Sequence, residues 1–222
     1  MQIAIAGGHG KIALLTAKQL SERGDEVLSL VRNPEHDADI RAAGARPVAA
    51  DLEQLTVDEL AERIAGSDAV VFAAGAGPNS GLARKDAVDR GGAVLLAEAA
   101  QKAGIRRYLL VSSMGVEGVR DGATPEGVGE VFVAYLRAKL AAEDDLRARQ
   151  LDWTVLRPGG LTDDPATGAV QLTPDAPRGQ VPRADVAAVL VALLDEPRSA
   201  GLVLQLTEGP TPIDEALQAA LR

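Results

Sequence analysis

The chain has 222 residues, a formal net charge of −9 at pH 7 and no cysteine. The lack of cysteine excludes disulfides and thiolate metal sites, and His9 and His36 are too few for a His-rich site, so no metal is predicted. The acidic balance argues against a nucleic-acid partner. The sequence contains no run of eighteen apolar residues, so no membrane span is predicted. The first residues are typical of a strand rather than of a signal peptide. We therefore expect a soluble cytoplasmic protein.

The first thirteen residues combine a strand, a glycine turn and the start of a helix. The apolar segment Ile3 to Ala6 runs into Gly-Gly-His-Gly, and helical spacing begins at once. The spacing Gly7-x-x-Gly10-x-x-Ala13 is close to the dinucleotide-binding fingerprint. The first glycine permits a tight turn, the second a close approach of a pyrophosphate, and Ala13 close helix–strand packing. The turn predicts dinucleotide binding; the alternative is a tight β–α turn in an unrelated α/β protein.

Strands and helices alternate along the rest of the chain. Strands are expected at 26–31, 46–50, 68–74, 107–112, 153–156 and 202–206, and the segment 169–172 is compatible with a short one. Helices are expected before Gly24, up to residue 43, and over 55–65, 86–103, 130–149, 186–194 and 214–221. The glycine-rich segment 115–129 is typical of a mobile loop, and 161–182 reads as irregular.

This alternation favours a Rossmann-type α/β fold, a doubly wound parallel sheet with helices on both faces. No internal repeat or linker divides the chain. We expect one domain over residues 1–222, in which 158–182 and 199–222 contribute a small C-terminal substrate lobe.

Residues near three strand ends bear on the cofactor. Arg32 lies 22 residues after Gly10, where NAD-preferring sites usually carry an acid for the ribose hydroxyl. A guanidinium suits a 2′-phosphate, so the sequence favours NADP, with NAD and a plain surface arginine as alternatives. Asp51 would accept from the adenine amino group or cap the next helix. The small residues 75–77 let a cofactor lie over the strand ends.

The chemistry is predicted from a tyrosine and a lysine four residues apart on one helix. Tyr135 and Lys139 share a face at this spacing, and a nearby ammonium is expected to lower the pKa of the phenol. The phenol would then serve as general acid or base at a carbonyl or hydroxyl. Lys139 can also reach ribose hydroxyls, and Ser112 or Ser113, after the strand 107–112, can bind the reacting oxygen. A solvated helix face is the alternative reading.

The chain resembles the atypical short-chain dehydrogenases/reductases, in particular the NmrA-like and biliverdin reductase B-like NAD(P)-binding group. The resemblance spans almost the whole chain. Its motifs follow the family order: Gly7-x-x-Gly10-x-x-Ala13, Arg32, Asp51-Leu52, Val111-Ser112-Ser113, Tyr135-x-x-x-Lys139, Leu156-Arg157-Pro158-Gly159 and Arg183-Ala184-Asp185-Val186-Ala187.

The resemblance implies a role for each matching position. The pyrophosphate would be lined by Gly7, Gly8, His9, Gly10, Lys11 and Ile12, and the 2′-phosphate by Arg32. Asp51 and Leu52 would flank the adenine, and Ala73, Ala74 and Gly75 would lie along the adenosine half. Lys139 would hold the nicotinamide ribose, and Pro158, Gly159 and Leu161 would pack by the nicotinamide. Tyr135, Lys139, Ser113 and Ser112 would form the catalytic group.

Two classes of function remain open at this point. The first is an NADP(H)-dependent oxidoreductase, or an epimerase working through transient oxidation, on a small carbonyl or hydroxy compound; flavin or quinone reduction is a variant of it. The second is a non-catalytic NADP(H) sensor that binds a partner protein. Members of this atypical group often keep the cofactor site while losing catalysis. The sequence does not choose between a monomer and a homodimer.

Overall fold

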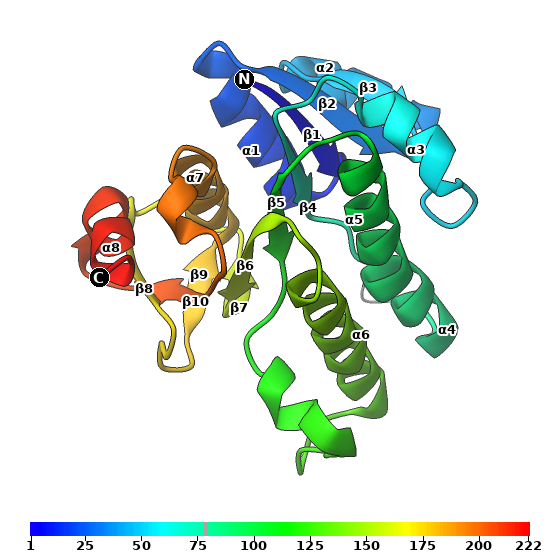
Figure 1. Ribbon diagram of the computed structural model, residues 1–222. Helices are drawn as coiled ribbons and strands as arrows, with labels where there is room; N and C mark the ends of the chain where they lie inside the picture. Colours follow the sequence, from blue (N-terminus) through cyan, green and yellow to red (C-terminus); the bar gives the residue numbers. More distant parts are fainter. Residues whose placement is uncertain (78–79) are drawn as a thin grey trace.

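The computed structural model describes residues 1–77 and 80–222, and in this part of the chain nine strands form one sheet (Figure 1). Seven are mutually parallel, in the order β3-β2-β1-β4-β5-β6-β10, and β8 and β11 continue the sheet in antiparallel fashion beyond β10. Their bounds are β1 Gln2–Ala6, β2 Glu26–Val31, β3 Arg46–Ala49, β4 Ala69–Phe72, β5 Arg107–Val111, β6 Asp152–Pro158, β8 Ala169–Thr173, β10 Leu202–Glu208 and β11 Thr211–Pro212. The predicted Rossmann-type sheet is confirmed.

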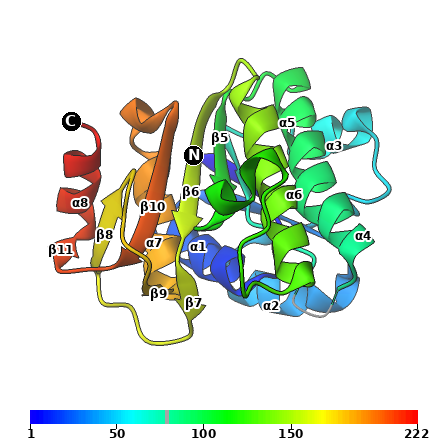
Figure 2. The ribbon, with the colours of Figure 1, turned by 90° about the horizontal axis from the view of Figure 1, so that it is seen from below.

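Helices cover both faces of the sheet because the side chains of each buried strand alternate between them. Ile3 and Ile5 of β1 face one apolar core, whereas Ala4 and Ala6 face the other. The first core takes α1 (Lys11–Glu22), α2 (Asp37–Ala42), α7 (Arg183–Leu194) and α8 (Ile213–Ala220). The second takes α3 (Val57–Ile64), α5 (Gly92–Lys102) and the C-terminal half of α6 (Glu130–Arg147). Figure 2 shows α5 and α6 together on their side of the sheet.

The predicted helix 86–103 contains an irregularity that matters for the site. It begins earlier, as α4 (Leu82–Lys85), passes through a π-helical turn (Asp86–Gly91) and continues as α5. A π turn has one more residue per hydrogen-bonded turn than an α-helix, and such turns are frequent at functional sites. Here the turn carries Asp89, whose side chain is fully buried.

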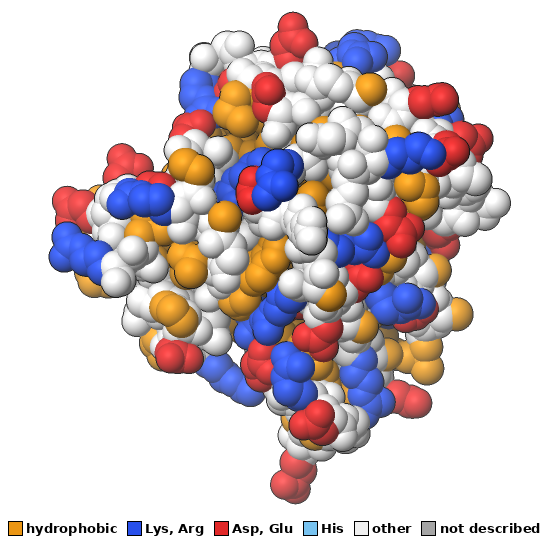
Figure 3. Space-filling model, in the orientation of Figure 1, with side chains coloured by type: hydrophobic (Ala, Val, Ile, Leu, Met, Phe, Trp, Pro, Cys, Tyr) orange, Lys and Arg blue, Asp and Glu red, His pale blue; other side chains and the backbone are white. Residues whose placement is uncertain are grey.

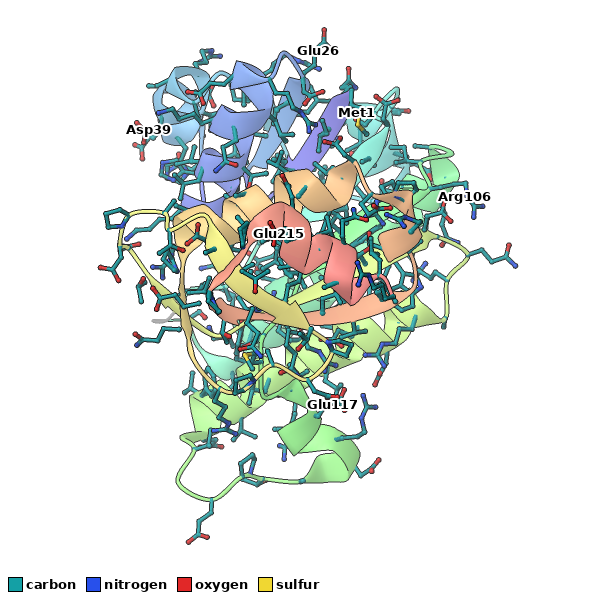
Figure 4. The ribbon with its side chains drawn as sticks, turned by 90° about the vertical axis from the view of Figure 1, so that its left-hand side faces the viewer. Met1, Glu26, Asp39, Arg106, Glu117 and Glu215 are labelled. Atoms are coloured by element: carbon teal, nitrogen blue, oxygen red, sulfur yellow. The ribbon has the colours of Figure 1, made fainter. Side chains whose placement is uncertain are left out.

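The segment 115–129, expected to be a loop, contains a short helical stretch of 3-10 type at Val116–Gly122. The loop prediction is wrong there because Val116 and Val119 are buried against Val133, Leu136 and Leu140. An ion pair of 2.6 Å also joins Glu117 to Arg157 of β6. Figure 4 labels Glu117 in this segment. Gly115 before the stretch and Gly122 at its end take positive φ values. The stretch is interrupted at Arg120 and Asp121, whose backbone angles are not helical.

The segment 161–182 is more regular than the sequence indicates. β7 (Gly160–Thr162) and β9 (Gln180–Pro182) pair in parallel as a separate small sheet, and the expected strand near 169–172 is β8. The turn before β8 is fixed by Asp185 of α7, whose buried carboxylate accepts from the backbone N–H groups of Thr167 and Gly168. The late strand and the closing helix are confirmed as β10 and α8. Within the two described ranges, no helix combines the length and the apolarity that crossing a bilayer demands.

Candidate functional site

The glycine turn follows β1 and begins α1, as predicted. Gly7 has φ +79°, and a Cβ there would lie 2.5 Å from the Cα of Ala74. A Cβ on Gly8 would lie 2.6 Å from the side chain of Ser29, so both glycines are required by the neighbouring strands. Gly10 differs, because the nearest atom to its Cβ would be the Gly7 carbonyl oxygen at 3.2 Å. Among the residues that the structure describes, no side chain caps α1, so its first N–H groups, which lack helical partners, remain available to an anion.

Two adjoining pockets lie along the carboxyl ends of the parallel strands and share Ala73, Ala74 and Gly75. The larger, which we call the adenosine pocket, has a volume of about 410 Å³. The smaller, the reaction pocket, has a volume of about 170 Å³. Dinucleotides bind at this edge of open α/β sheets. On the face shown in Figure 3, acidic and basic side chains are interspersed, with no field of one sign.

Most predicted site residues line one of these pockets. Those in the adenosine pocket are Gly7, Gly8, His9, Gly10, Arg32, Asp51 and Leu52. Those in the reaction pocket are Ile12, Ser112, Ser113, Tyr135, Lys139, Pro158, Gly159 and Leu161. Ile12 therefore lies on the reaction side rather than along the adenosine pocket. Lys11 lines neither pocket; its ammonium pairs with Asp163, which also pairs with Arg183.

Two charged residues that were not predicted, Glu53 and Arg84, join the predicted Arg32 at the adenosine pocket. Arg32 Nη1 lies 2.9 Å from Glu53 Oε2, and Arg84 Nη2 lies 3.4 Å from the same oxygen. All three side chains line the pocket. Glu53 directly follows the predicted pair Asp51-Leu52, which offered a sequence signal. Arg84 offered none, because it comes from α4, far along the chain.

The structure separates the two readings of Asp51. Its Oδ1 accepts from the backbone N–H of Glu53, within a turn. The cap of α3 is Thr56, whose hydroxyl accepts from the Glu59 N–H while the Glu59 carboxylate accepts from the Thr56 N–H. The helix-capping interpretation of Asp51 is therefore wrong. Its place in the adenosine pocket is compatible with the adenine-binding interpretation, which stays a prediction.

Lys139 is almost completely buried beneath the reaction pocket. Its ammonium donates to the carbonyl oxygens of Val111, at 3.0 Å, and Ala74, at 3.3 Å, and it lies 3.4 Å from Asp89 Oδ1. Burial lowers the pKa of Lys139, and the Asp89 carboxylate opposes that change. The sequence did not point to Asp89, because nothing in its pattern distinguishes it from the exposed acids of the same helix.

The pKa of Tyr135 does not follow the sequence expectation. Burial raises the pKa of the phenol to about 12, the charge of Asp89 adds to this rise, and the side chain of Ser113 acts against it. The predicted lowering by Lys139 is wrong for this structure, because burial of the phenol dominates and the Asp89 charge acts in the same direction. Lys85, also buried, lies 5.4 Å from the centroid of the Tyr135 ring, and its ammonium donates to the Gly77 carbonyl.

The two serines after β5 have different surroundings. The Ser112 hydroxyl donates to Glu143 at 2.5 Å. Glu143 is fully buried and also binds Arg157. Among the described residues, the Ser113 hydroxyl donates only to the Met114 carbonyl. The Ser113 side chain also lowers the pKa of Tyr135, against the rise that burial causes. Ser113 is thus the serine that accompanies Tyr135, and Ser112 belongs to the buried polar network behind it.

The fold and the pockets agree with comparisons to known proteins. A model of the family described as NAD(P)H-binding matches residues 7–197. The uncharacterized sugar epimerase YhfK of Bacillus subtilis (strain 168) is 36% identical over 219 residues, which cover 98% of this chain and 99% of that protein. Two solved structures are also similar. One, from Bacillus halodurans and described as a candidate NAD-dependent epimerase/dehydratase, has a TM-score of 0.88 and 34% identity over 99% of both chains.

The other is the anaerobillin reductase ChuY from Escherichia coli O157:H7. It has a TM-score of 0.78 and 26% identity, covering 95% of this chain and 100% of that one. These relatives confirm the predicted resemblance to Rossmann-type NAD(P)-binding oxidoreductases. With the family model matching most of its length, the chain belongs to the NAD(P)H-binding family.

Proposed function

We propose that this protein is an NADPH-dependent reductase of small carbonyl compounds. The observation that carries the proposal is the placement of Tyr135, with Lys139 and Ser113, in a reaction pocket that adjoins the glycine turn and the adenosine pocket. A phenol in that position can protonate an oxygen of a substrate lying beside the cofactor. The segments 158–182 and 199–222 are our proposed substrate lobe, since Pro158, Gly159 and Leu161 form one wall of the pocket.

The adenosine pocket supports NADP over NAD. Two arginines, Arg32 and Arg84, converge there on the single carboxylate oxygen of Glu53. Guanidinium groups at this position suit a phosphate, which would compete with Glu53 for them. We propose that both arginines contact the 2′-phosphate and that Arg32 contributes more, because its ion pair is the shorter.

In the proposed reaction, Tyr135 and Ser113 of the reaction pocket have separate roles. A bound nicotinamide would supply the hydride to the carbonyl carbon. The Tyr135 hydroxyl donates a proton to the carbonyl oxygen, so that the C=O group becomes an alcohol. Ser113 holds that oxygen beside the phenol. With its pKa raised to about 12, Tyr135 is protonated near neutral pH and is suited to this donor role, whereas epimerisation through oxidation would first require a base.

The test is a binding and turnover experiment on the purified protein. Calorimetric titration with NADPH and NADH measures nucleotide affinity. Loss of NADPH absorbance is then followed with a panel of aldehydes, ketones, quinones and flavins. We expect tight NADPH binding and turnover of at least one class. Failure of NADPH to bind would overturn the cofactor assignment.

A non-catalytic NADP(H) sensor is the second candidate. Leu82 of α4 and Val131 and Phe132 of α6 are exposed apolar side chains, and α4 packs against α6. Exposed apolar residues on adjoining elements can serve as a contact surface for a partner. Tight NADPH binding without turnover of any panel compound would favour this function over reduction.

A further inference from the structure

The strongest unassigned feature of the reaction pocket is the buried carboxylate of Asp89. Its Oδ2 accepts from the backbone N–H of Ala76 at 3.1 Å. Its Oδ1 is buried, has no hydrogen-bond partner among residues 1–77 and 80–222, and lies 3.4 Å from the Lys139 ammonium. A Cβ on Gly75 would come within 3.2 Å of this Oδ1. The glycine after β4 and the π-helical turn therefore together bring the carboxylate to the lysine.

The pair has a direct electrostatic effect on the phenol. Lys139 Nζ lies 5.9 Å from the centroid of the Tyr135 ring. An unpaired ammonium this close in a buried site would favour the phenolate. With Asp89 beside it, the two groups together carry no net charge, whichever of them holds the proton. Burial then favours the protonated phenol, with the Asp89 charge adding to this effect and Ser113 acting against it, and Tyr135 remains a proton donor.

Other charges near the pair do not take over this role. Lys85 of α4 lies 5.4 Å from the Tyr135 ring centroid and donates to the neutral Gly77 carbonyl, so it bears on the phenol equally in the unmodified protein and in Asp89 variants. Arg137 of α6 is exposed and donates to Gly122, Ala123 and Thr124, and Glu130 and Asp121 are exposed.

Arg84 pairs with Glu53 and Lys102 with Asp58, and the other charged groups on α4, α5, α6, the π-helical turn and Val116–Gly122 have partners of opposite sign among the described residues. These pairs are Glu143 with Arg157 and Arg147, Glu117 with Arg157 and Arg120, Arg120 with Asp144, Arg90 with Asp86, and Arg149 with Glu98 and Asp145. Asp89 is thus the carboxylate that sets the charge beside Tyr135.

We propose that Asp89 is a positioning residue that holds Lys139, cancels its charge and keeps the Tyr135 hydroxyl protonated, the form that donates a proton in reduction. This inference rests on the proposed reductase function. The reductive step leaves a phenolate, which regains its proton from solvent through the pocket. The reverse oxidation needs the phenolate at the start, and Asp89 disfavours that form.

The test is an ultraviolet titration of tyrosinate, which needs neither cofactor nor substrate. The chain has two tyrosines, and Tyr135→Phe identifies which signal belongs to Tyr135. Asp89→Asn leaves the Lys139 ammonium uncompensated, so we expect the midpoint of the Tyr135 titration to move down by roughly 1–3 pH units. Asp86→Asn is the matched control, since Asp86 lies in the same π-helical turn but pairs with exposed Arg90. It should leave the titration unchanged. If the Tyr135 midpoint in Asp89→Asn is unchanged or higher, the proposal is overturned.

A second variant covers the case in which Asp89→Asn alone does not fold. Asp89→Asn combined with Lys139→Met replaces the pair by neutral groups. In this double variant the midpoint of the Tyr135 titration should lie close to that of the unmodified protein. If the double variant instead shows a large downward shift, the effect does not come from the lysine charge and the proposal fails. Once a substrate is known, Asp89→Asn should also move the pH optimum of alcohol oxidation downward. Absence of any turnover would contradict the reductase function, while the titration would still decide the role of Asp89.

Discussion

The adenosine pocket and the reaction pocket both contain arginine or lysine paired with a carboxylate, yet the two pairs differ in burial. The Arg32 side chain is 52% exposed and its partner Glu53 25% exposed, whereas Lys139 and Asp89 are 4% and 0% exposed. Exposed ion pairs contribute little and exchange partners readily. A buried pair is costly to break, because one charge is then left without compensation. The first pocket is therefore suited to exchanging a carboxylate for a phosphate, and the second to keeping its charges fixed.

The largest effect is expected at the phenol of the reaction pocket. Tyr135→Phe keeps the ring and the helix but removes the proton donor. Turnover of a true substrate should fall by about 10²–10⁴-fold, the usual contribution of general acid catalysis. NADPH affinity should stay the same, since the phenol is assigned to the substrate. Steady-state kinetics and calorimetry on the same preparation measure both. A fully active Tyr135→Phe protein would end the donor role of this residue.

The two ion pairs should differ most clearly in stability. Lys139→Met leaves the Asp89 carboxylate buried and unpaired, so the free energy of unfolding should fall by about 3–5 kcal/mol. Arg32→Ala removes a partner of an exposed pair and should lower it by less than about 1 kcal/mol. Urea unfolding of the two variants in parallel makes the comparison. Equal losses would show that burial does not separate the two pockets.

Cofactor choice should depend on the exposed pair. Arg32→Ala should weaken NADPH binding by about ten- to a hundred-fold, since a hydrogen bond to a charged group contributes roughly 1.5–3 kcal/mol. NADH binding should hardly change, because NADH lacks the 2′-phosphate. Calorimetry with both nucleotides tests this. Equal affinity of the unmodified protein for the two would contradict the assignment.

The smallest expected effect is at Glu53. Glu53→Gln removes the carboxylate that competes with the 2′-phosphate, so NADPH should bind more tightly, by up to about fivefold, in line with the energy of an exposed ion pair. Glu62→Gln, an exposed acid on α3 outside the pocket, is the control and should bind NADPH as the unmodified protein does. Weaker NADPH binding in Glu53→Gln would show that the carboxylate orients the arginines instead.

Sequence patterns predicted the Rossmann-type sheet because strand and helix periodicity are local properties. The sequence could also locate three parts of the site, because each lies at a strand end or on one helix face. These are the glycine turn, Arg32 and the Tyr135–Lys139 pair. Asp89 and Arg84 could not, because their roles depend on a π-helical turn and on the contact of α4 with the turn that follows β3. The wrong pKa expectation for Tyr135 has a related origin: the sequence shows neither the burial of the phenol, which is the main cause of its raised pKa, nor the Asp89 carboxylate that adds to it.

The π-helical turn affects the two pockets differently. In an α-helix, one residue changes the direction of a helix face by about 100°. A π turn has a smaller twist per residue, so the six residues Asp86–Gly91 turn the chain about as far as five α-helical residues would. Deleting a single residue from this turn would therefore give an ordinary helix with little change in the orientation of α4 against α5. Lys85, which lies over the Tyr135 ring, and Arg84 would keep their places, whereas Asp89 would lose its position beside Lys139. The turn thus acts on the reaction pocket and leaves the adenosine pocket unchanged.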